Sequence, residues 1–230
     1  MRSNSQRRKV AALLYGALLG LVACSGSAPD AGGATQAAGD SAVAPAPRQT
    51  ILVVGTSLTA GLGLEPEQAY PAILQQKVDS ANLPFEVVNA GVSGETSSAL
   101  LRRIDWLLQQ PFDWVVVETG ANDGLRGVPV ETMRTNIRQI IAAIRAARPA
   151  ARIALVRMEA PPNLGAQYTR EFRETFPRIA REAGVELLPF LLEGVAGVRS
   201  LNQGDGIHPN EEGARLVAEN IWKGLRPLLD

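Results

Sequence analysis

Two kinds of hydrophobic pattern alternate along most of the chain. Near-continuous runs of β-branched and aliphatic residues are typical of strands that are buried on both faces of a sheet. Such runs occupy residues 51–54, 85–88, 114–117, 153–156 and 185–188. Elsewhere, most clearly in residues 130–147 and 211–228, hydrophobic residues recur every three or four positions, and this spacing predicts helices with one buried face.

Strands that alternate with helices indicate an α/β fold. Each strand–helix–strand unit joins two parallel strands through a right-handed crossover, and the helices then cover the sheet. We therefore expect a three-layer α/β/α sandwich around a five-stranded parallel sheet, of the flavodoxin-like kind. The sequence contains no internal repeat.

The first residues have the layout of a secretory signal peptide. Four basic residues, Arg2, Arg7, Arg8 and Lys9, precede an uncharged stretch at positions 10–23 that ends in small residues. This stretch is shorter than the about 20 apolar residues that a membrane-spanning helix needs. We expect residues 1–23 to be a signal peptide and the protein to be exported to the periplasm.

The signal peptide ends in a motif that contains the only cysteine. Residues 21–24, Leu-Val-Ala-Cys, resemble a bacterial lipobox, whose cysteine becomes the lipid-modified first residue of the mature protein. This resemblance implies a membrane anchor at Cys24, and Ser25 after it is permissive for delivery to the outer membrane. Two alternatives stay open: cleavage near Ala23 or Ala28 without lipidation, or an uncleaved anchor.

Residues 25–47 connect this anchor to the rest of the chain. Of these 23 residues, 18 are Ala, Gly, Ser or Pro, so the segment cannot bury enough apolar surface to offset the entropy of ordering it. We expect a lipidated N-terminus and flexible linker over residues 24–47. One domain then covers residues 48–230.

Composition and charge exclude several classes of protein. The 230 residues include 23 basic and 23 acidic ones, and without the four basic residues before Cys24 the exported chain has a net charge of −4. This balance gives no reason to expect nucleic acid as a partner. A single cysteine and a single histidine, His208, exclude an internal disulfide and a zinc site built from Cys and His. We expect a monomer that needs no metal or other cofactor.

Polar turn segments follow the predicted strands. They lie at residues 55–58, 89–96, 120–123 and 205–208. In open parallel sheets, ligands bind outside the carboxyl ends of the strands. We therefore expect the four segments to meet at one edge of the sheet and to form the functional site there.

Three residues in these segments have the chemistry of a nucleophilic triad. A serine hydroxyl becomes an effective nucleophile when a base takes its proton and a third group fixes the tautomer of that base. The only imidazole available to Ser57 is His208, and Asp205 lies three residues before it. A tetrahedral intermediate also needs hydrogen-bond donors, for which the N–H groups of Ser57 and Gly94 and the amide of Asn122 are the candidates.

Each of these residues also has a purely structural interpretation when it is taken alone. Ser57 could cap a helix, Gly94 could be a turn glycine that opens a helix near residue 95, and Asn122 could belong to a plain loop. His208 could precede a helix whose first residue is Pro209. The coincidence of all four segments at one edge favours the catalytic interpretation.

The four segments also resemble the four sequence blocks of the SGNH, or GDSL, hydrolase family, in order, over residues 50–228. Gly-Thr-Ser-Leu at 55–58 resembles the block with the nucleophile, and Val-Ser-Gly-Glu-Thr-Ser at 92–97 resembles the block whose glycine donates an oxyanion N–H. Gly-Ala-Asn-Asp at 120–123 resembles the block whose asparagine donates a side-chain amide. Asp-Gly-Ile-His-Pro-Asn at 205–210 resembles the block that completes the triad.

This resemblance implies the SGNH hydrolase fold and a serine hydrolase in which Ser57, Asp205 and His208 form the triad. One position departs from the family pattern. Thr56 stands where the family commonly has aspartate, so the hydrogen bond that this aspartate makes near the nucleophile must be made by a hydroxyl or not at all. We expect an altered rate or pH profile and not an inactive enzyme.

Two further segments narrow the resemblance to a subgroup. Gly-Leu-Arg-Gly at 124–127 and Glu-Leu-Leu-Pro-Phe at 186–190 resemble periplasmic acyl-CoA thioesterase I / lysophospholipase L1 and related arylesterases. The resemblance implies hydrolysis of short- to medium-chain esters, including aryl esters, with thioesters and lysophospholipids as further substrates. The alternatives are a carbohydrate O-acetylesterase of the same fold and a non-catalytic envelope-binding module.

Residues 159–168 follow the fourth predicted strand and should border the same cleft. In the subgroup this region resembles a mobile loop that senses the acyl chain, whereas its two adjacent prolines favour a rigid turn to the same degree. We expect Ala160 and Leu164 to line an acyl groove.

Overall fold

Five parallel strands form the centre of the computed structural model, which describes residues 47–229. The strands are β1 (Gln49–Gly55), β2 (Phe85–Gly91), β3 (Trp114–Val117), β4 (Arg152–Arg157) and β5 (Glu186–Phe190), in the sheet order β2-β1-β3-β4-β5. The predicted five-stranded parallel sheet is confirmed. The predictions of a signal peptide, a lipidated Cys24 and most of the linker concern residues 1–46, which lie outside the described residues.

The expected burial on both faces is correct for the inner strands only. Every residue of β3 is buried, and so are Ile51–Val54 of β1 in the register beside it. The edge strands β2 and β5 are partly exposed, and Val88 and Leu187 are about two-fifths accessible to solvent. Edge position also explains why β5 tolerates Pro189, since a strand with one neighbour can spare a main-chain N–H.

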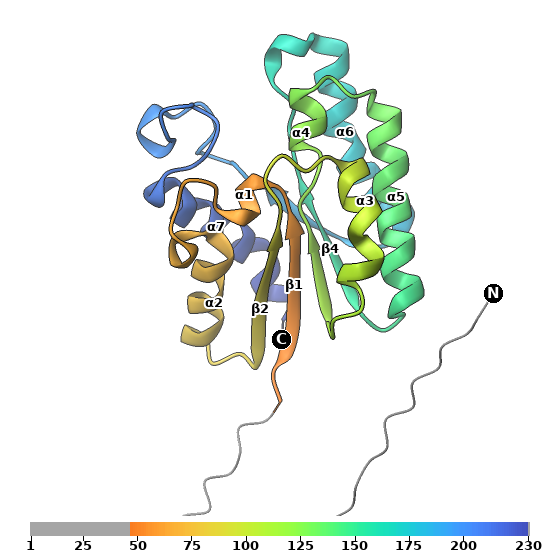
Figure 1. The fold of residues 1–230 in the computed structure, drawn as a ribbon, viewed down its shortest axis with the longest axis vertical. Coiled ribbons are helices and arrows are strands. Elements are labelled where there is room, and N and C mark those ends of the chain that lie inside the picture. The colour runs from red at the N-terminus through yellow and green to blue at the C-terminus, as the bar shows by residue number, and fades with distance from the viewer. Residues whose placement is uncertain (1–46, 230) are drawn as a thin grey trace, which may run out of the picture. The chain divides into compact units, whose positions relative to one another are not determined.

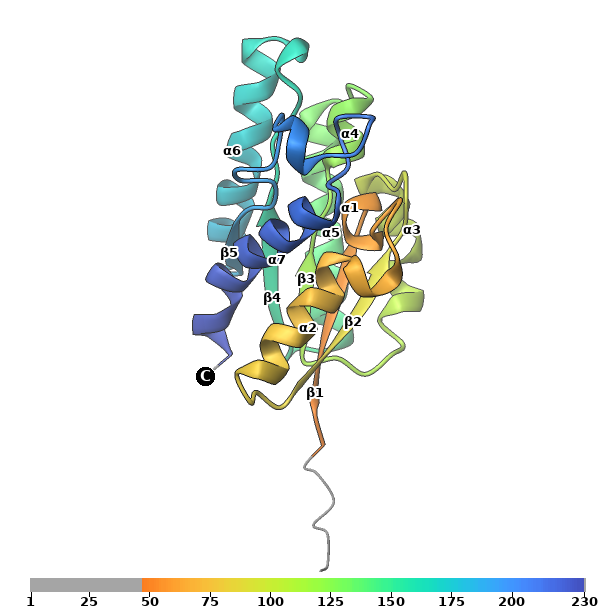
Figure 2. The same cartoon turned by 90° about the vertical axis from the view of Figure 1, so that its left-hand side faces the viewer.

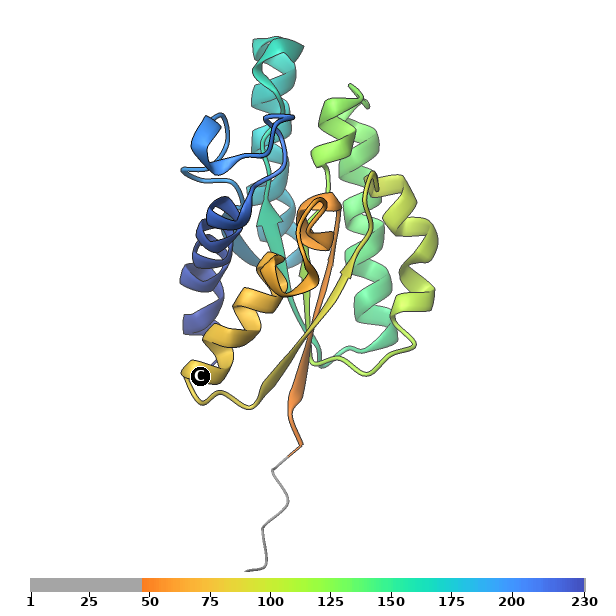
Figure 3. The same ribbon diagram turned by 60° about the vertical axis from the view of Figure 1, so that its left-hand side comes forward.

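Helices cover the two faces of the sheet. One layer consists of α2 (Tyr70–Ser80) and α7 (Glu211–Leu225), which pack against each other. The other consists of α3 (Ser97–Leu107), α5 (Val130–Ala147) and α6 (Ala166–Ala183). Figures 1 and 3 show the sheet between these layers, and Figure 2 looks onto the layer of α2 and α7. The predicted three-layer α/β/α sandwich is confirmed.

Several predicted helix boundaries shift for local reasons. The helix of residues 130–147 is as predicted, but the last helix ends at Leu225 and continues as a 3₁₀ turn, Arg226–Leu228, because Pro227 cannot donate an α-helical hydrogen bond. The helix expected near residue 95 begins at Ser97, where the Thr96 side chain accepts a hydrogen bond from the N–H of Ala99.

The segment that follows β4 is less open than its sequence suggests. Residues Pro162–Leu164 form a 3₁₀ turn, and α6 already begins at Ala166, so the loop expected over residues 159–168 is confined to its first part. Two short helices, α1 (Ser57–Ala60) and α4 (Ala121–Leu125), directly follow β1 and β3. No helix among the described residues is long and apolar enough to span a bilayer.

The chain therefore brings its polar turns to the carboxyl edge of the sheet. The strand order reverses direction around β1, with β2 on one side and β3 on the other. Such a reversal leaves a crevice at the carboxyl ends of the two central strands, which is where open α/β sheets bind their ligands. The four polar segments predicted to form the functional site all lie along this edge.

Candidate active site

Ser57 begins the short helix that follows the first strand. Thr56 occupies the N-cap, and its hydroxyl accepts a hydrogen bond from the N–H of Leu58 at 3.4 Å. The capping role considered for Ser57 therefore belongs to its neighbour. Ser57 itself is 7% exposed and lines the cleft at the edge of the sheet.

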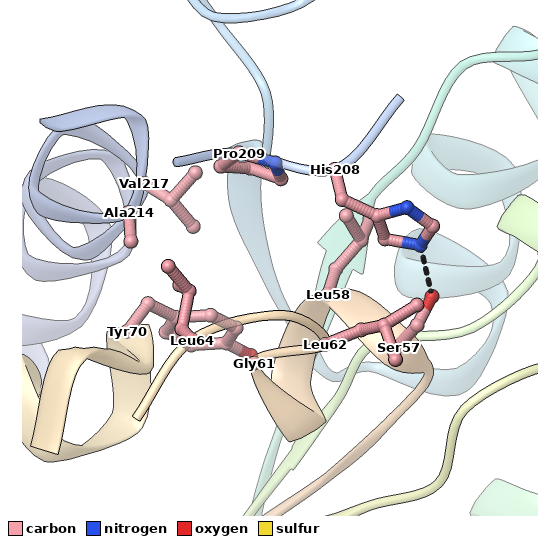
Figure 4. A pocket seen from close by; sticks show the side chains of 10 residues that line it. All are labelled: Ser57, Leu58, Gly61, Leu62, Leu64, Tyr70, His208, Pro209, Ala214 and Val217. Atoms are coloured by element: carbon pink, nitrogen blue, oxygen red, sulfur yellow. Dashed lines mark hydrogen bonds between the residues drawn. The ribbon is translucent and has the colours of Figure 1, made fainter. Parts of the chain in front are cut away.

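Ser57, His208 and Asp205 lie in one continuous chain of hydrogen bonds. Nε2 of His208 is 2.9 Å from Oγ of Ser57 (Figure 4), and Nδ1 of His208 is 2.6 Å from Oδ2 of Asp205. The structure thus joins two segments that are 151 residues apart in sequence. A proton on Nδ1 faces the carboxylate and leaves Nε2 free to accept the proton of the serine.

Asp205 is held by its own turn. Its Oδ1 accepts hydrogen bonds from the N–H groups of Ile207 at 2.9 Å and His208 at 3.0 Å. The hydrogen bond from the His208 side chain, together with these two main-chain bonds, lowers the pKa of Asp205 to about 2. The carboxylate is therefore ionised at neutral pH and can stabilise a positively charged imidazole.

His208 does not stand where the structural interpretation put it. Pro209 lies outside the last helix, and Asn210 is the N-cap, whose side chain accepts the N–H of Gly213 at 3.0 Å. Helix α7 begins at Glu211. His208 is thus separated from the helix by a short extended segment, which lets its ring turn toward Ser57.

An apolar shell supports the serine–histidine pair from behind. A cavity of about 10 Å³ lies beside this pair. Figure 4 shows the aliphatic side chains and Tyr70 that line it. Its lining includes Leu58, Leu64, Pro209, Ala214 and Val217. A space of this size holds at most about one water molecule, so these side chains pack closely beside the imidazole.

The expected oxyanion donors face the same cleft. Gly94 has a φ of 77°, a conformation that favours glycine, and it lines the cleft with Ser57 and Asn122. Among the described residues, the N–H groups of Ser57 and Gly94 have no hydrogen-bond partner. Nδ2 of Asn122 donates one hydrogen to the main-chain oxygen of Glu95 at 3.0 Å, which leaves its second hydrogen for a ligand.

Two residues that the sequence analysis missed hold this donor set in place. Nη2 of Arg126 donates to the main-chain oxygen of Gly94 at 2.9 Å. Asp123, which is 1% exposed, accepts hydrogen bonds from the N–H of Ser97 at 2.8 Å and from its hydroxyl at 2.6 Å. The start of α3 is thereby fixed to α4, one residue beyond Asn122. Asp123 belongs to the polar segment 120–123, and its charge there was the available signal.

The cleft itself has a volume of about 700 Å³ and a largely apolar lining. Three half-exposed aliphatic residues stand at it, Leu62, Leu125 and Ile207. Ala160 lines the cleft as expected, whereas Leu164 is not among the lining residues. Leu164 ends the 3₁₀ turn Pro162–Leu164, and Pro162 is the last residue of this segment that lines the cleft.

A parallel α/β sandwich with a Ser–His–Asp chain of hydrogen bonds and three available hydrogen-bond donors at its carboxyl edge is typical of a serine hydrolase. The model of the GDSL-like Lipase/Acylhydrolase family matches residues 53–216. The chain belongs to this family, and it is an ester hydrolase.

Named relatives cover most of the chain. It is 39% identical over 182 residues to Esterase TesA of Pseudomonas aeruginosa, a match that spans 79% of this chain and 90% of that protein. It is also 39% identical over 182 residues to Thioesterase 1/protease 1/lysophospholipase L1 of Escherichia coli strain K12, covering 79% of this chain and 85% of the relative.

A solved structure has the same fold. The crystal structure of the psychrotrophic esterase EstA from Pseudoalteromonas sp., inhibited by monoethylphosphonate, superimposes with a TM-score of 0.74 at 37% identity. The match covers 79% of this chain and 98% of that one.

Proposed function

We propose that the protein is an exported serine esterase that hydrolyses carboxylic esters through an acyl-enzyme on Ser57. The observation that carries this proposal is the chain of hydrogen bonds from Ser57 through His208 to Asp205, with distances of 2.9 and 2.6 Å, at an apolar cleft.

Acylation follows from the direction of these hydrogen bonds. Nε2 of His208 takes the proton of Ser57 as Oγ attacks the carbonyl carbon of the ester, and Asp205 stabilises the imidazolium that forms. The imidazolium then gives this proton to the leaving alcohol or thiol, and the C–O or C–S bond breaks. The acyl group remains on Ser57.

The oxyanion is stabilised by donors that are oriented before the substrate binds. The N–H groups of Ser57 and Gly94 and the second amide hydrogen of Asn122 are the three donors. In deacylation His208 removes a proton from water, which attacks the acyl carbon, and the same donors serve the second intermediate. The bond between the acyl carbon and Oγ of Ser57 then breaks, the imidazolium returns its proton to Oγ, and the carboxylic acid leaves.

The lining of the cleft favours recognition of the substrate through its acyl or aryl group. Its lining is mainly aliphatic, and the side chains of Leu62, Leu125 and Ile207 are 46%, 48% and 45% exposed. Burying such surface against a ligand contributes about 25 cal/mol per Å². We propose short- to medium-chain esters as substrates, including aryl esters, with acyl thioesters and lysophospholipids as further members of the class.

Hydrolysis of p-nitrophenyl esters of increasing chain length tests the proposal. We expect Ser57→Ala to lower kcat at least about a thousandfold. Ser80→Ala, which removes an exposed hydroxyl bonded only to the main-chain oxygen of Gln76, is the matched control and should leave kcat unchanged. A Ser57→Ala variant that keeps most of the activity would overturn the assignment. Faster cleavage of acetylated sugars than of C4–C8 aryl esters would favour the carbohydrate O-acetylesterase instead.

We also propose that the mature enzyme is a monomer anchored by lipid on Cys24, in the periplasm and at the outer membrane. The support is the signal-peptide layout and the lipobox-like residues 21–24. The intact mass of protein extracted from membranes should include the lipid, and Cys24→Ala should abolish both the added mass and the membrane association. Analytical ultracentrifugation of the mature chain tests the oligomeric state, and we expect the mass of one chain.

A further inference from the structure

A buried carboxyl group that the triad does not use lies next to the turn of the nucleophile. Glu118 directly follows β3, and none of its surface is exposed. Its Oε2 accepts hydrogen bonds from the N–H of Thr56 at 2.7 Å and from the hydroxyls of Thr56 and Thr59, each at 2.9 Å. These two threonines lie on either side of Ser57 in the chain, so the carboxyl group is hydrogen-bonded to the turn that contains Ser57.

The donors form an ordered chain. The hydroxyl of Thr59 has one hydrogen, which it donates to Glu118, so the second contact of its oxygen must be as an acceptor. Its partner there is the hydroxyl of Tyr70, at 2.9 Å. Tyr70 is 1% exposed, and Figure 4 shows its ring extending from α2 toward α1. When Glu118 is ionised, every hydroxyl in this cluster therefore donates in the direction of its carboxylate.

Gly55 makes room for the cluster. A Cβ atom at this position would lie 2.0 Å from Oγ1 of Thr59 and 2.6 Å from Oε2 of Glu118. Real side chains do not approach so closely, so the glycine before Thr56 is required by the packing of the cluster and not by a turn conformation. Three consecutive residues, 55–57, thus take part in this cluster or in the turn that it holds.

The helix that carries Ser57 is too short to be stable by itself. It has four residues, Ser57–Ala60, whereas an isolated helix is marginal in water below about 12–15 residues. Its geometry therefore depends on contacts from outside, and these include the hydrogen bonds to Glu118 from Thr56, the N-cap, and from Thr59 within the helix.

We propose that Glu118 is a positioning residue for ester hydrolysis: by holding Thr56 and the first turn of α1, it sets the direction of the hydroxyl and the N–H of Ser57. This inference rests on the proposed role of Ser57. It also accounts for Thr56, whose hydroxyl and N–H both donate to the carboxyl group. An aspartate at position 56 would instead bring a second carboxyl group to the same place, and the two would have to share a proton.

The chain offers a matched control at the other end of the same strand. Asp113 directly precedes β3, as Glu118 directly follows it, and Oδ2 of Asp113 accepts a hydrogen bond from the N–H of Thr50 in β1 at 2.8 Å. Both residues thus attach a carboxyl group to β1 or its extension. Only Glu118 does so beside the nucleophile.

The experiment compares Glu118→Leu, Glu118→Gln and Asp113→Leu. Active sites are titrated with a fluorophosphonate, and kcat and KM are measured with a p-nitrophenyl ester. We expect Glu118→Leu to lower kcat about 10- to 100-fold, as small misplacements of reacting groups do, with KM changed less than about threefold. Glu118→Gln keeps an acceptor for the N–H of Thr56 and should restore most of kcat. Asp113→Leu should leave kcat per titrated site within about twofold, because it moves no reacting group.

Three outcomes overturn the inference. The first is a folded Glu118→Leu with wild-type kcat, and the second is an equal loss in Asp113→Leu. If Glu118→Leu does not fold, Thr56→Val and Thr59→Val are combined, since each removes one hydroxyl donor to Glu118. The third outcome is a wild-type kcat in this double variant. Ser57→Ala is measured in the same series. If it keeps the activity, the proposed function fails, whereas its loss together with unchanged Glu118 variants refutes only the positioning role.

Discussion

Gln203 joins the loop of His208 to the turn that follows Ser57. Its Nε2 donates to the main-chain oxygen of Leu62 at 2.7 Å and to that of Pro209 at 2.9 Å. Its own N–H donates to the main-chain oxygen of His208 at 2.7 Å. The turn after Ser57 and the loop of His208 are therefore joined by a side chain that hydrogen-bonds to neither of these two residues.

Replacing this side chain should loosen the triad without removing any member of it. Gln203→Leu has a similar size but loses both side-chain hydrogen bonds, each worth about 1 kcal/mol. We expect kcat to fall about tenfold with little change in KM. Gln167→Leu, which removes only a surface hydrogen bond to Glu171, serves as the control. Equal kcat values in the two variants would show that the tie is dispensable.

Asp205→Asn should reverse the tautomer of the His208 imidazole. The asparagine oxygen can still accept the N–H groups of Ile207 and His208, so its amide nitrogen turns toward Nδ1 and donates to it. The ring must then carry its proton on Nε2, where it cannot take the proton of Ser57. We expect kcat to fall about 10³- to 10⁴-fold with the fold intact. Steady-state kinetics and near-UV circular dichroism check both parts, and a loss below about tenfold contradicts the assignment.

Asn122→Ala should act on the transition state. It removes one oxyanion donor, for which losses of about 10²- to 10³-fold in kcat are typical. Because the donor acts on charge that is absent from the ground state, KM should change much less. The variant also frees the main-chain oxygen of Glu95, so its thermal unfolding is measured alongside. A variant that raises KM alone would place Asn122 in substrate binding instead.

Acyl-chain preference should respond to Ala160 and not to Leu164. Ala160 lines the cleft, so Ala160→Phe shortens the space for an acyl chain. We expect kcat/KM for a C8 ester to fall at least about tenfold relative to the acetyl ester, because each excluded methylene costs about 1–3 kcal/mol. Leu164→Phe, outside the lining, is the matched control. A chain-length profile that shifts equally in both variants refutes this role of the cleft.

The stability of the protein should depend on pH through Glu118. Burial raises the pKa of Glu118 above its ordinary value of 4.5, and the nearby Glu95 adds to this, while the bonds from Thr56 and Thr59 oppose it. Above pH 4.5 the unfolded chain has lost this proton and the folded chain still binds it, so the free energy of unfolding falls as pH rises toward the raised pKa.

Glu118→Gln lacks this ionisation. The free energy of unfolding of Glu118→Gln minus that of the wild type should therefore increase with pH over this window. Urea unfolding at a series of pH values measures it. A difference that stays flat, or that decreases with pH, would show that the carboxyl group is not held protonated by burial.

The fold was predictable because its pattern arises from local burial. The inner strands are apolar without interruption, since helices cover both of their faces, and residues 130–147 keep one stripe of apolar positions throughout. The edge strands were expected to be buried alike, because a short apolar run does not reveal whether it has one neighbour or two. The end of α7 was missed where Pro227 turns the chain into a 3₁₀ helix.

The site was predictable where it uses a residue type that is rare in this sequence. A single histidine leaves one possible base for Ser57, and the turn motifs place the remaining candidates. Glu118 and Gln203 were not predictable in the same way, because each acts through contacts with segments far away in sequence. The bond from Thr56 to Glu118 spans 62 residues, and the bond from Gln203 to Leu62 spans 141. Only a charged side chain directly after an apolar strand, as at position 118, hinted at such a role.

The strand direction also separates the molecule into two poles with different tolerances. The residues of the proposed triad, the proposed oxyanion donors and the cleft lie at the carboxyl pole, whereas the connections at residues 81–84, 108–113, 148–151 and 184–185 lie at the other. The start of β1 and the end of α7 lie at this second pole too (Figure 1). A fusion partner, a surface-display carrier or a new pair of termini made by circular permutation can therefore be attached there while the cleft stays open to its substrate.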